Sequence, residues 1–342
     1  MATHLKHGPI KLLFAIALIV AAVVLGLFWQ RTQSFADRPI LLEGQEQILV
    51  VEPGDGFNAV LGKIRRLGVV QGHDLEWKAL ATTLRVADRL QVGEYAITPG
   101  MSPRTLLLKL GKGEVVQRKF TIVEGWNFRE LRAALAANAL LVHEIDQLSD
   151  AEIMARLGRA ELHPEGRFLP ETYVFIRGTG ELAILDRAAK AMDETLAELW
   201  ESRAKDLPLQ TADELLTLAS IVEKETGLAS ERPMIAGVFV RRLKLGMRLE
   251  TDPTVIYGMG SAYAGNIRKT DLQTDTPYNT YAHGGLPPTP IAMPGRAALE
   301  ASAHPAPGSA LYFVASGGGA HYFSDDYAEH TAAVRKYQLK RP

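Results

Sequence analysis

Two glutamates near the end of one predicted helix are the residues in this chain best placed for acid–base chemistry. Thr211 and Glu214 form a capping box that opens a helix of sequence ADELLTLASIVEKET, and Gly227 is placed to close it. At 100° per residue, Glu223 and Glu225 fall on opposite flanks of an apolar stripe, so either could face a cleft. Glu225 lies in the last turn, where the negative end of the helix dipole favours the protonated carboxyl that a general acid needs. Spacing by itself leaves a surface or ion-pair role open for both.

The segment after residue 251 is rich in glycine, proline and aromatic residues, which predicts long shaped loops around a cleft. Tyr257, Tyr278 and Tyr281 in these loops can stack on a ligand or donate hydrogen bonds, and amide and hydroxyl side chains can bind its polar groups. Asp252-Pro253 indicates a structural turn rather than an acid–base partner, and residues 284–288 indicate rigid backbone along a groove. The candidate substrate-binding residues are Glu223 (in an orienting or structural role), Asp252, Tyr257, Tyr278, Asn279, Thr280 and Gly285.

Several other chemistries lack the residues they require. The chain has no cysteine, and its nine histidines include no H-E-x-x-H pair, so neither a metal site nor a cofactor is expected. Ser220 precedes Lys224 by four positions, one too many for the S-x-x-K acylation motif. Lys and Arg total 38 against 39 Asp and Glu, and a formal charge of −1 gives no basic field for nucleic acid.

An uncharged apolar run occupies residues 12–29, just long enough to cross a bilayer as a helix. A cleaved signal peptide is the alternative, but the run is longer than the usual apolar region and no small-x-small cleavage site follows it. Lys6 and Lys11 before the run are matched by Arg31 and Arg38 after it, so charge counting does not orient the span. Because long domains cross membranes largely regardless of charge, residues 1–11 are predicted to be a cytoplasmic tail, with the remainder outside the cytoplasm.

The rest of the chain predicts an α+β protein with two folded parts. After a connector at 30–45, residues 47–55 predict a strand that ends in a Pro-Gly-Asp turn, followed by a helix at 57–67. A second strand at 93–97 and a helix at 102–110 complete a pattern that resembles the LysM module, so residues 46–118 are predicted to be a LysM-like α+β subdomain. Residues 119–342 predict a larger domain, mainly helical at first, with a terminal strand pair at 311–315 and 321–324.

Four long segments resemble a known family. LASIVEKETGLASER, LGMRLETDPTVIYGMG, TPYNTYAHGGLPPTPIAMPG and LYFVASGGGAHYFS together are similar to the endolytic murein transglycosylase (YceG-like) family of bacterial inner membranes. The resemblance implies a mixed α/β catalytic domain over residues 119–342, preceded by a single transmembrane helix. It also implies that the catalytic acid is the second glutamate of the I-V-E-K-E-T helix, which is Glu225 here, near the C-terminal end of that helix.

The same resemblance implies the reaction and the partners. A lytic transglycosylase can work with one carboxyl, because the muramic acid's own 6-hydroxyl attacks C1 and leaves a 1,6-anhydro end. The expected partners are peptidoglycan glycan strands, the inner membrane and peptidoglycan synthases (penicillin-binding proteins), and a periplasmic location follows for most of the chain. Two alternatives stay open: a hydrolytic muramidase that pairs Glu225 with a second carboxylate, and a non-catalytic scaffold that binds glycan and recruits synthases.

Overall fold

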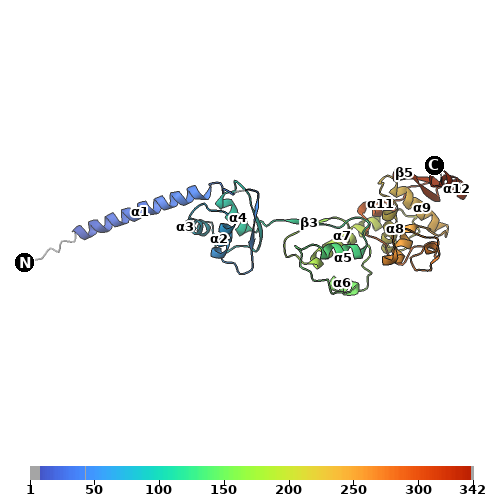
Figure 1. Cartoon of the computed structure of the whole chain (residues 1–342), viewed down its shortest axis with the longest axis horizontal. Helices are drawn as coiled ribbons and strands as arrows, with labels where there is room; N and C mark the ends of the chain where they lie inside the picture. The colour runs from blue at the N-terminus through green and yellow to red at the C-terminus, as the bar shows by residue number, and fades with distance from the viewer. Residues whose placement is uncertain (1–7, 43, 340–342) are drawn as a thin grey trace, which may run out of the picture. The chain divides into compact units, whose positions relative to one another are not determined.

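The computed structural model describes residues 8–42 and 44–339 and divides the chain into two compact units (Figure 1). Unit 1 comprises residues 1–118 and unit 2 residues 119–342. Of the predicted tail, residues 1–7 lie outside the described part, and residue 8 begins a helix. Each unit is described by itself.

Unit 1 is built around one antiparallel strand pair and the helices that cover it. Leu49 of one strand lies opposite Tyr95 of the other, and both are fully buried. The two predicted strands and the two predicted helices are found within one or two residues of their expected ends, and one further helix lies between them. The elements are α1 (Gly8–Ala36), β1 (Gln47–Val51), α2 (Phe57–Arg66), α3 (Asp74–Thr83), β2 (Gly93–Ile97) and α4 (Pro103–Lys112).

Helix α1 runs further than the apolar run alone predicts. Residues 30–36, assigned to a connector on sequence, continue the helix. The reason is tertiary packing, since Phe35 and Ala36 are buried in the core of unit 1 and the Phe35 ring meets the Trp77 ring at 5.2 Å. Among the described residues, the segment Lys11–Ala36 is the one helix long and apolar enough to cross a membrane, a property that a signal sequence shares.

Unit 2 is mainly helical with short strands paired two by two, which confirms the α+β class. β3 pairs with β4 and β5 pairs antiparallel with β6, so the predicted terminal strand pair is present. The elements are β3 (Arg118–Thr121), α5 (Phe128–Ala136), α6 (Asp150–Arg156), β4 (Thr172–Phe175), α7 (Glu181–Ser202), α8 (Ala212–Glu225), α9 (Arg232–Lys244), α10 (Asp252–Met259), α11 (Arg296–Ala303), β5 (Tyr312–Gly317), β6 (Ala320–Ser324) and α12 (Tyr327–Tyr337), with single 3₁₀ turns at Gly260–Ala262 and Asp271–Gln273.

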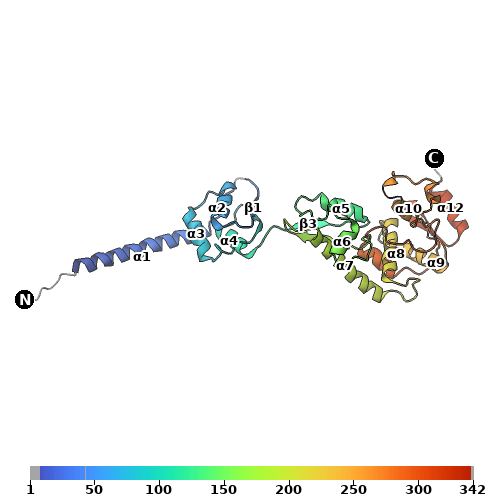
Figure 2. The same ribbon diagram turned by 90° about the horizontal axis from the view of Figure 1, so that it is seen from below.

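Helix α8 is the central helix of unit 2, and Figure 2 shows it beside α9. The expectation of a single apolar stripe is wrong for its middle, where every residue from 215 to 222 is buried. The cause is that α7, α9 and α11 all pack against it. Its polar side chains are satisfied locally: the Ser220 hydroxyl donates to the Thr217 carbonyl at 2.7 Å and accepts from the Ile291 N–H at 3.0 Å.

The two ends of α8 are only partly as the sequence predicts. At the start, the Thr211 hydroxyl accepts from the Glu214 N–H at 3.2 Å, which confirms the N-cap. The Glu214 carboxylate accepts instead from the Gln210 N–H, one residue outside the expected capping box. At the other end Gly227 is not the cap, because the chain already turns extended at Thr226 (φ −145°), so the helix stops at Glu225.

Candidate active site

Glu225 is the last residue of α8, and it faces the first turn of α10. The Thr251 hydroxyl, at the N-cap of α10, donates a hydrogen bond to Oε1 of Glu225. Thr251 follows Glu250, a non-glycine residue in the left-handed region at φ 49°. Such backbone strain is stored where the surroundings over-determine a conformation. Here the sharp turn at Glu250 brings the start of α10 to the carboxyl that ends α8.

The carboxyl of Glu225 holds its proton unusually tightly. Burial raises its pKa to about 7, and the negative charge of Asp252 raises it as well, while the Thr251 hydrogen bond and the charge of His321 act in the opposite direction. A carboxyl with this pKa is substantially protonated near neutral pH. It therefore meets the first requirement of a general acid.

An open cavity of about 460 Å³ lies against Glu225. Six segments distant in sequence build it: the end of α8, α9, the start of α10 with the residues just before it, the loop around 281, the β5–β6 pair and α12. The groups around it are a mixture of hydroxyls, rings and carboxylates, which suits a polar, ring-shaped ligand. The polar residues that line it include Glu225, Thr251, Asp252, Tyr281, Tyr312 and His321.

Asp252 and Tyr281 form a pair at the edge of this cavity. The Tyr281 hydroxyl donates to Oδ1 of Asp252 at 2.7 Å. Burial raises the pKa of Tyr281, and the hydrogen bond to Asp252 raises it further, so the phenol stays neutral. Asp252 was expected to form a turn and to contribute to substrate binding, not to act as an acid–base partner. The structure places its carboxylate in the same cavity as Glu225, close enough for its charge to act on that group.

Asn279 and Thr280, predicted to bind substrate, are buried within their own loop. The Asn279 amide donates to the carbonyls of Leu272 (3.0 Å) and Thr274 (2.7 Å), and its oxygen accepts from the Tyr281 N–H at 2.9 Å. The Thr280 hydroxyl accepts from the Thr251 N–H at 3.1 Å. In this structure both side chains hold the loop that carries Tyr281, and both are nearly inaccessible.

Glu223 lies apart from the Glu225 cavity. Its Oε2 accepts from the Gly295 N–H at 3.0 Å, and its Oε1 lies 3.5 Å from Arg232. Burial raises the pKa of Glu223, although the Gly295 hydrogen bond works against that. The structure therefore gives this side chain partners within the fold, in keeping with the structural role that the sequence suggests.

Tyr257 and Tyr278 line a second cavity, of about 540 Å³, rather than the first. Their rings meet edge-on at 4.8 Å. The end of α8 and the start of α10 contribute to both cavities. Glu225 and Asp252 line the first, and their sequence neighbours Lys224 and Pro253 line the second. Gly285 lines neither of these and lies instead on a third cavity with residues 286–290.

Glu165 is a residue of the second cavity that sequence reasoning missed. It is 3% exposed and accepts hydrogen bonds from the Phe128 N–H (3.1 Å) and the Tyr257 hydroxyl (3.0 Å). Burial raises its pKa to about 7. The one local sign is the following Gly166, where glycine is favoured both by the positive φ of 79° and by the close approach of Pro290, which a Cβ would meet. Nothing near Glu165 in sequence announces its partners, which lie 37 and 92 residues away.

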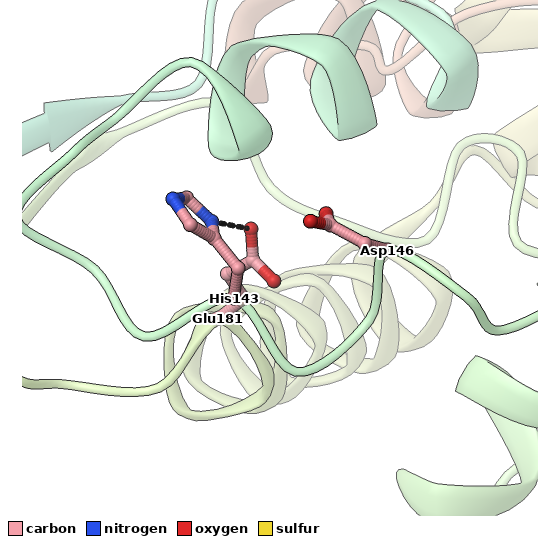
Figure 3. Close-up of side chains that lie close together, drawn as sticks. All are labelled: His143, Asp146 and Glu181. Atoms are coloured by element: carbon pink, nitrogen blue, oxygen red, sulfur yellow. Dashed lines mark hydrogen bonds and ion pairs between the residues drawn. The ribbon is translucent and has the colours of Figure 1, made fainter.

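Among the residues that the structure describes, one group of three potential metal ligands lies close together: His143, Asp146 and Glu181 (Figure 3). Glu181, fully buried at the start of α7, accepts from His143 Nδ1 at 2.9 Å and from the N–H groups of Glu144 and Ile145. The hydrogen bond to Glu181 raises the pKa of His143. Both carboxylate oxygens of Glu181 therefore already accept hydrogen bonds, and these bonds hold loop 143–146 against the start of α7.

A carboxyl of raised pKa, set beside an open cavity lined by tyrosines and a second carboxylate, is the arrangement of an acid–base enzyme of the kind that cleaves glycosidic bonds. The YceG-like family model matches residues 49–336. The chain therefore belongs to the YceG-like family, which confirms the resemblance drawn from its motifs.

Relatives of this chain carry a consistent name. The chain is 32% identical over 268 residues to an endolytic murein transglycosylase of Bacillus subtilis, covering 73% of this chain and 74% of that protein. It is 28% identical over 370 residues to an endolytic murein transglycosylase of Streptococcus pneumoniae, covering 98% of this chain and 66% of that protein. A crystal structure of a yceG-like protein from Listeria monocytogenes is 28% identical, with a TM-score of 0.56, and the match covers 85% of this chain and 99% of that one.

Proposed function

We propose that this protein is an endolytic peptidoglycan transglycosylase whose catalytic acid is Glu225. The observation that carries the proposal is the carboxyl at the end of α8, with its pKa raised to about 7, beside an open polar cavity. Relatives named endolytic murein transglycosylase support peptidoglycan as the substrate. The bond that is broken is the glycosidic bond between N-acetylmuramic acid and N-acetylglucosamine within a strand.

The reaction needs one proton donor that becomes a proton acceptor. Glu225 donates its proton to the oxygen that leaves C1 of N-acetylmuramic acid, and the C1–O bond breaks. The carboxylate then takes the proton of that sugar's 6-hydroxyl as its oxygen bonds to C1, which closes a 1,6-anhydro ring and restores the acid. No water is consumed, and an intramolecular hydroxyl has the high effective molarity that a free water lacks.

Asp252 supports the positive charge that develops on the sugar during this step. Its carboxylate lies in the Glu225 cavity and is oriented by the Tyr281 hydroxyl. A fixed negative group near a developing oxocarbenium ion lowers the barrier without itself transferring a proton. The second cavity, with Tyr257 and Tyr278, continues on the other side of α10's first turn and offers a place for sugars further along the strand.

The muramidase alternative has a specific observation in its favour. Asp252 is a second carboxylate in the same cavity, and hydrolytic glycosidases use two. In that reaction Asp252 would act on a water molecule or on C1 directly, and the product would be a reducing end. The chemical nature of the new ends therefore separates the two enzymes.

The location of the reaction follows from the N-terminal helix. Helix α1 anchors the chain by a single pass in the inner membrane, and both units lie in the periplasm. There the LysM-like unit 1 binds glycan, and the enzyme terminates strands that peptidoglycan synthases extend. Support for this part comes from the apolar composition of Lys11–Ala36 and from the resemblance of unit 1 to LysM.

The test compares the full chain in detergent with its Glu225→Gln variant on purified glycan strands. Gln keeps the shape and can still accept the Thr251 hydrogen bond, but it has no proton to donate. We expect strand cleavage to fall at least about a thousandfold while strand binding is retained. Glu194→Gln, at an exposed position on α7, is the matched control and should cleave normally. Equal cleavage by wild type and Glu225→Gln would refute the assignment, and no cleavage by wild type would favour a glycan-binding scaffold.

A further inference from the structure

Unit 1 begins to cover α1 almost as soon as the apolar run ends. Trp29 closes that run and is 56% exposed, whereas Thr32 is only 2% exposed because the folded part of unit 1 packs over it. Three residues of helix rise about 4.5 Å. The polar headgroup layer of a bilayer extends about 5–8 Å beyond the hydrocarbon on each side. If α1 spans the membrane, the nearest part of unit 1 must lie within that layer.

The part of unit 1 that lies beside the end of α1 is the loop of residues 70–73, which leads into α3. A cavity of about 770 Å³ is lined on one side by α1 residues from Leu27 to Phe35 and by Arg38 just after α1, and on the other side by residues 70–73 and Glu76. Figures 1 and 2 both show α3 beside the end of α1. The loop therefore lies alongside the stretch of α1 that leaves the hydrocarbon.

The loop and the first turn of α3 present apolar side chains outward. Val70 is 78% exposed and Leu75 is 69% exposed, among the highest values for large apolar residues of unit 1 outside α1. Arg38 is exposed and lines the same cavity as Val70. Apolar groups beside a cation are the combination that interfacial membrane-binding segments use, with the apolar groups entering the headgroup boundary and the cation near phosphates.

The loop is held in this position by hydrogen bonds to its backbone. The Arg65 guanidinium donates to the carbonyls of Val69 (2.9 Å), Gln71 (3.0 Å) and Gly72 (2.6 Å). The Trp77 indole N–H donates to the Gln71 carbonyl at 3.0 Å. Gly72, at φ 70°, packs so closely on the Phe35 ring that a Cβ would lie 2.3 Å from it. The exposure of Val70 and Leu75 is thus built into the fold.

We infer that the surface formed by Arg38, Val70 and Leu75 is a membrane-contact surface, bound to the lipid headgroups of the leaflet in which α1 ends. This inference rests on the proposed single-pass anchor and adds to it a second attachment. Its consequence is that unit 1 lies against the bilayer instead of extending freely from it on the helix.

Because the natural chain has no cysteine, single-cysteine variants can carry one fluorophore each. The full chain is reconstituted in phosphatidylcholine–phosphatidylglycerol vesicles with a headgroup-spin-labelled lipid as quencher, and a deep-brominated lipid in parallel. Labels at Val70→Cys and Leu75→Cys report the surface. Val92→Cys, at an exposed position just before β2 and outside the cavity that Val70 lines, is the control in the same unit, and Val20→Cys within α1 reports insertion.

We expect the spin-labelled lipid to quench the labels at 70 and 75 at least about threefold more than the label at 92, with the label at 20 quenched by the brominated lipid. Quenching at 20 with equal, weak quenching at 70, 75 and 92 would overturn the contact surface and leave the anchor standing. Absence of quenching at 20 would overturn the anchor and the contact surface together. Neither result bears on the role of Glu225.

Discussion

At the scale of single residues, the account depends on a carboxyl that keeps its proton. Glu225 and Glu165 both have a pKa raised to about 7 by burial, yet they differ in surroundings. Both residues line cavities, but the Glu165 side chain is nearly inaccessible and already accepts hydrogen bonds from the Phe128 N–H and the Tyr257 hydroxyl, whereas Glu225 is partly exposed to its cavity. Access to a ligand is therefore the reason for proposing Glu225, and not Glu165, as the acid.

Replacing Asp252 by Asn should shift the pH profile of cleavage. Burial sets most of the Glu225 pKa, but the Asp252 charge raises it, so removing that charge lowers the pKa of Glu225. Because the acid must be protonated, the alkaline limb of kcat/KM, near pH 7 in the wild type, should move to lower pH by up to about one unit. Steady-state rates from pH 5 to 9 provide the measurement, with Glu194→Gln as a control that removes a distant charge. An unmoved limb, or one displaced to higher pH, would contradict this coupling.

Glu225→Gln should also stabilise unit 2, but only at higher pH. The pKa of Glu225 is about 7 in the folded protein and about 4.5 in the unfolded chain, so ionisation of Glu225 lowers the free energy of unfolding. The loss begins above pH 4.5 and is complete above pH 7. Gln carries no charge at any pH. Thermal denaturation should therefore show a higher midpoint for the variant at pH 8, by about 2–4 °C per kcal/mol, and little difference at pH 4.5. Equal thermal midpoints of wild type and Glu225→Gln at pH 8 would show that ionised Glu225 does not destabilise the folded state.

At the scale of elements, local patterns predicted the helices better than the site they form. The N-cap at Thr211 and the strands β1, β2, β5 and β6 follow from turn residues and periodicity close to them in sequence. The cavity could not be predicted in the same way, because it joins Glu225 to residues 26, 56 and 96 positions later, namely Thr251, Tyr281 and His321. The same limit explains why the predicted tyrosines Tyr257 and Tyr278 prove to line a neighbouring cavity.

The loop that carries Tyr281 should depend on Asn279. Asn279→Ala removes three hydrogen bonds and leaves the buried carbonyls and N–H that it served without that partner. We expect a loss of about 1–3 kcal/mol in the free energy of unfolding of unit 2, together with reduced kcat because Tyr281 and Asp252 lose their orientation. Urea denaturation and rate measurements on the same variant check both effects. Full stability with unchanged kcat would show that the loop holds its shape without this side chain.

At the scale of the whole molecule, each unit has a hydrophobic core of its own. Leu106 of α4 is fully buried in the core of unit 1. Leu106→Ala should lower the free energy of unfolding of unit 1 by about 2–5 kcal/mol. It should reduce binding to intact peptidoglycan more than the rate on short soluble strands, since unit 1 binds glycan in the proposal while Glu225 lies in unit 2. A loss of rate on short strands as large as the loss of binding would contradict this division of labour.

The most direct test of the central claim is the origin of the oxygen at the new strand ends. Full-length protein digests glycan strands in water enriched in ¹⁸O, and mass spectrometry reads the ends. We predict 1,6-anhydro-muramic ends that are free of ¹⁸O and about 20 Da lighter than ends hydrolysed by H₂¹⁸O, because the 6-hydroxyl attacks and no water enters. Those ends should be absent with Glu225→Gln. Reducing ends that carry ¹⁸O would show that water is the nucleophile, and the protein would then be a muramidase.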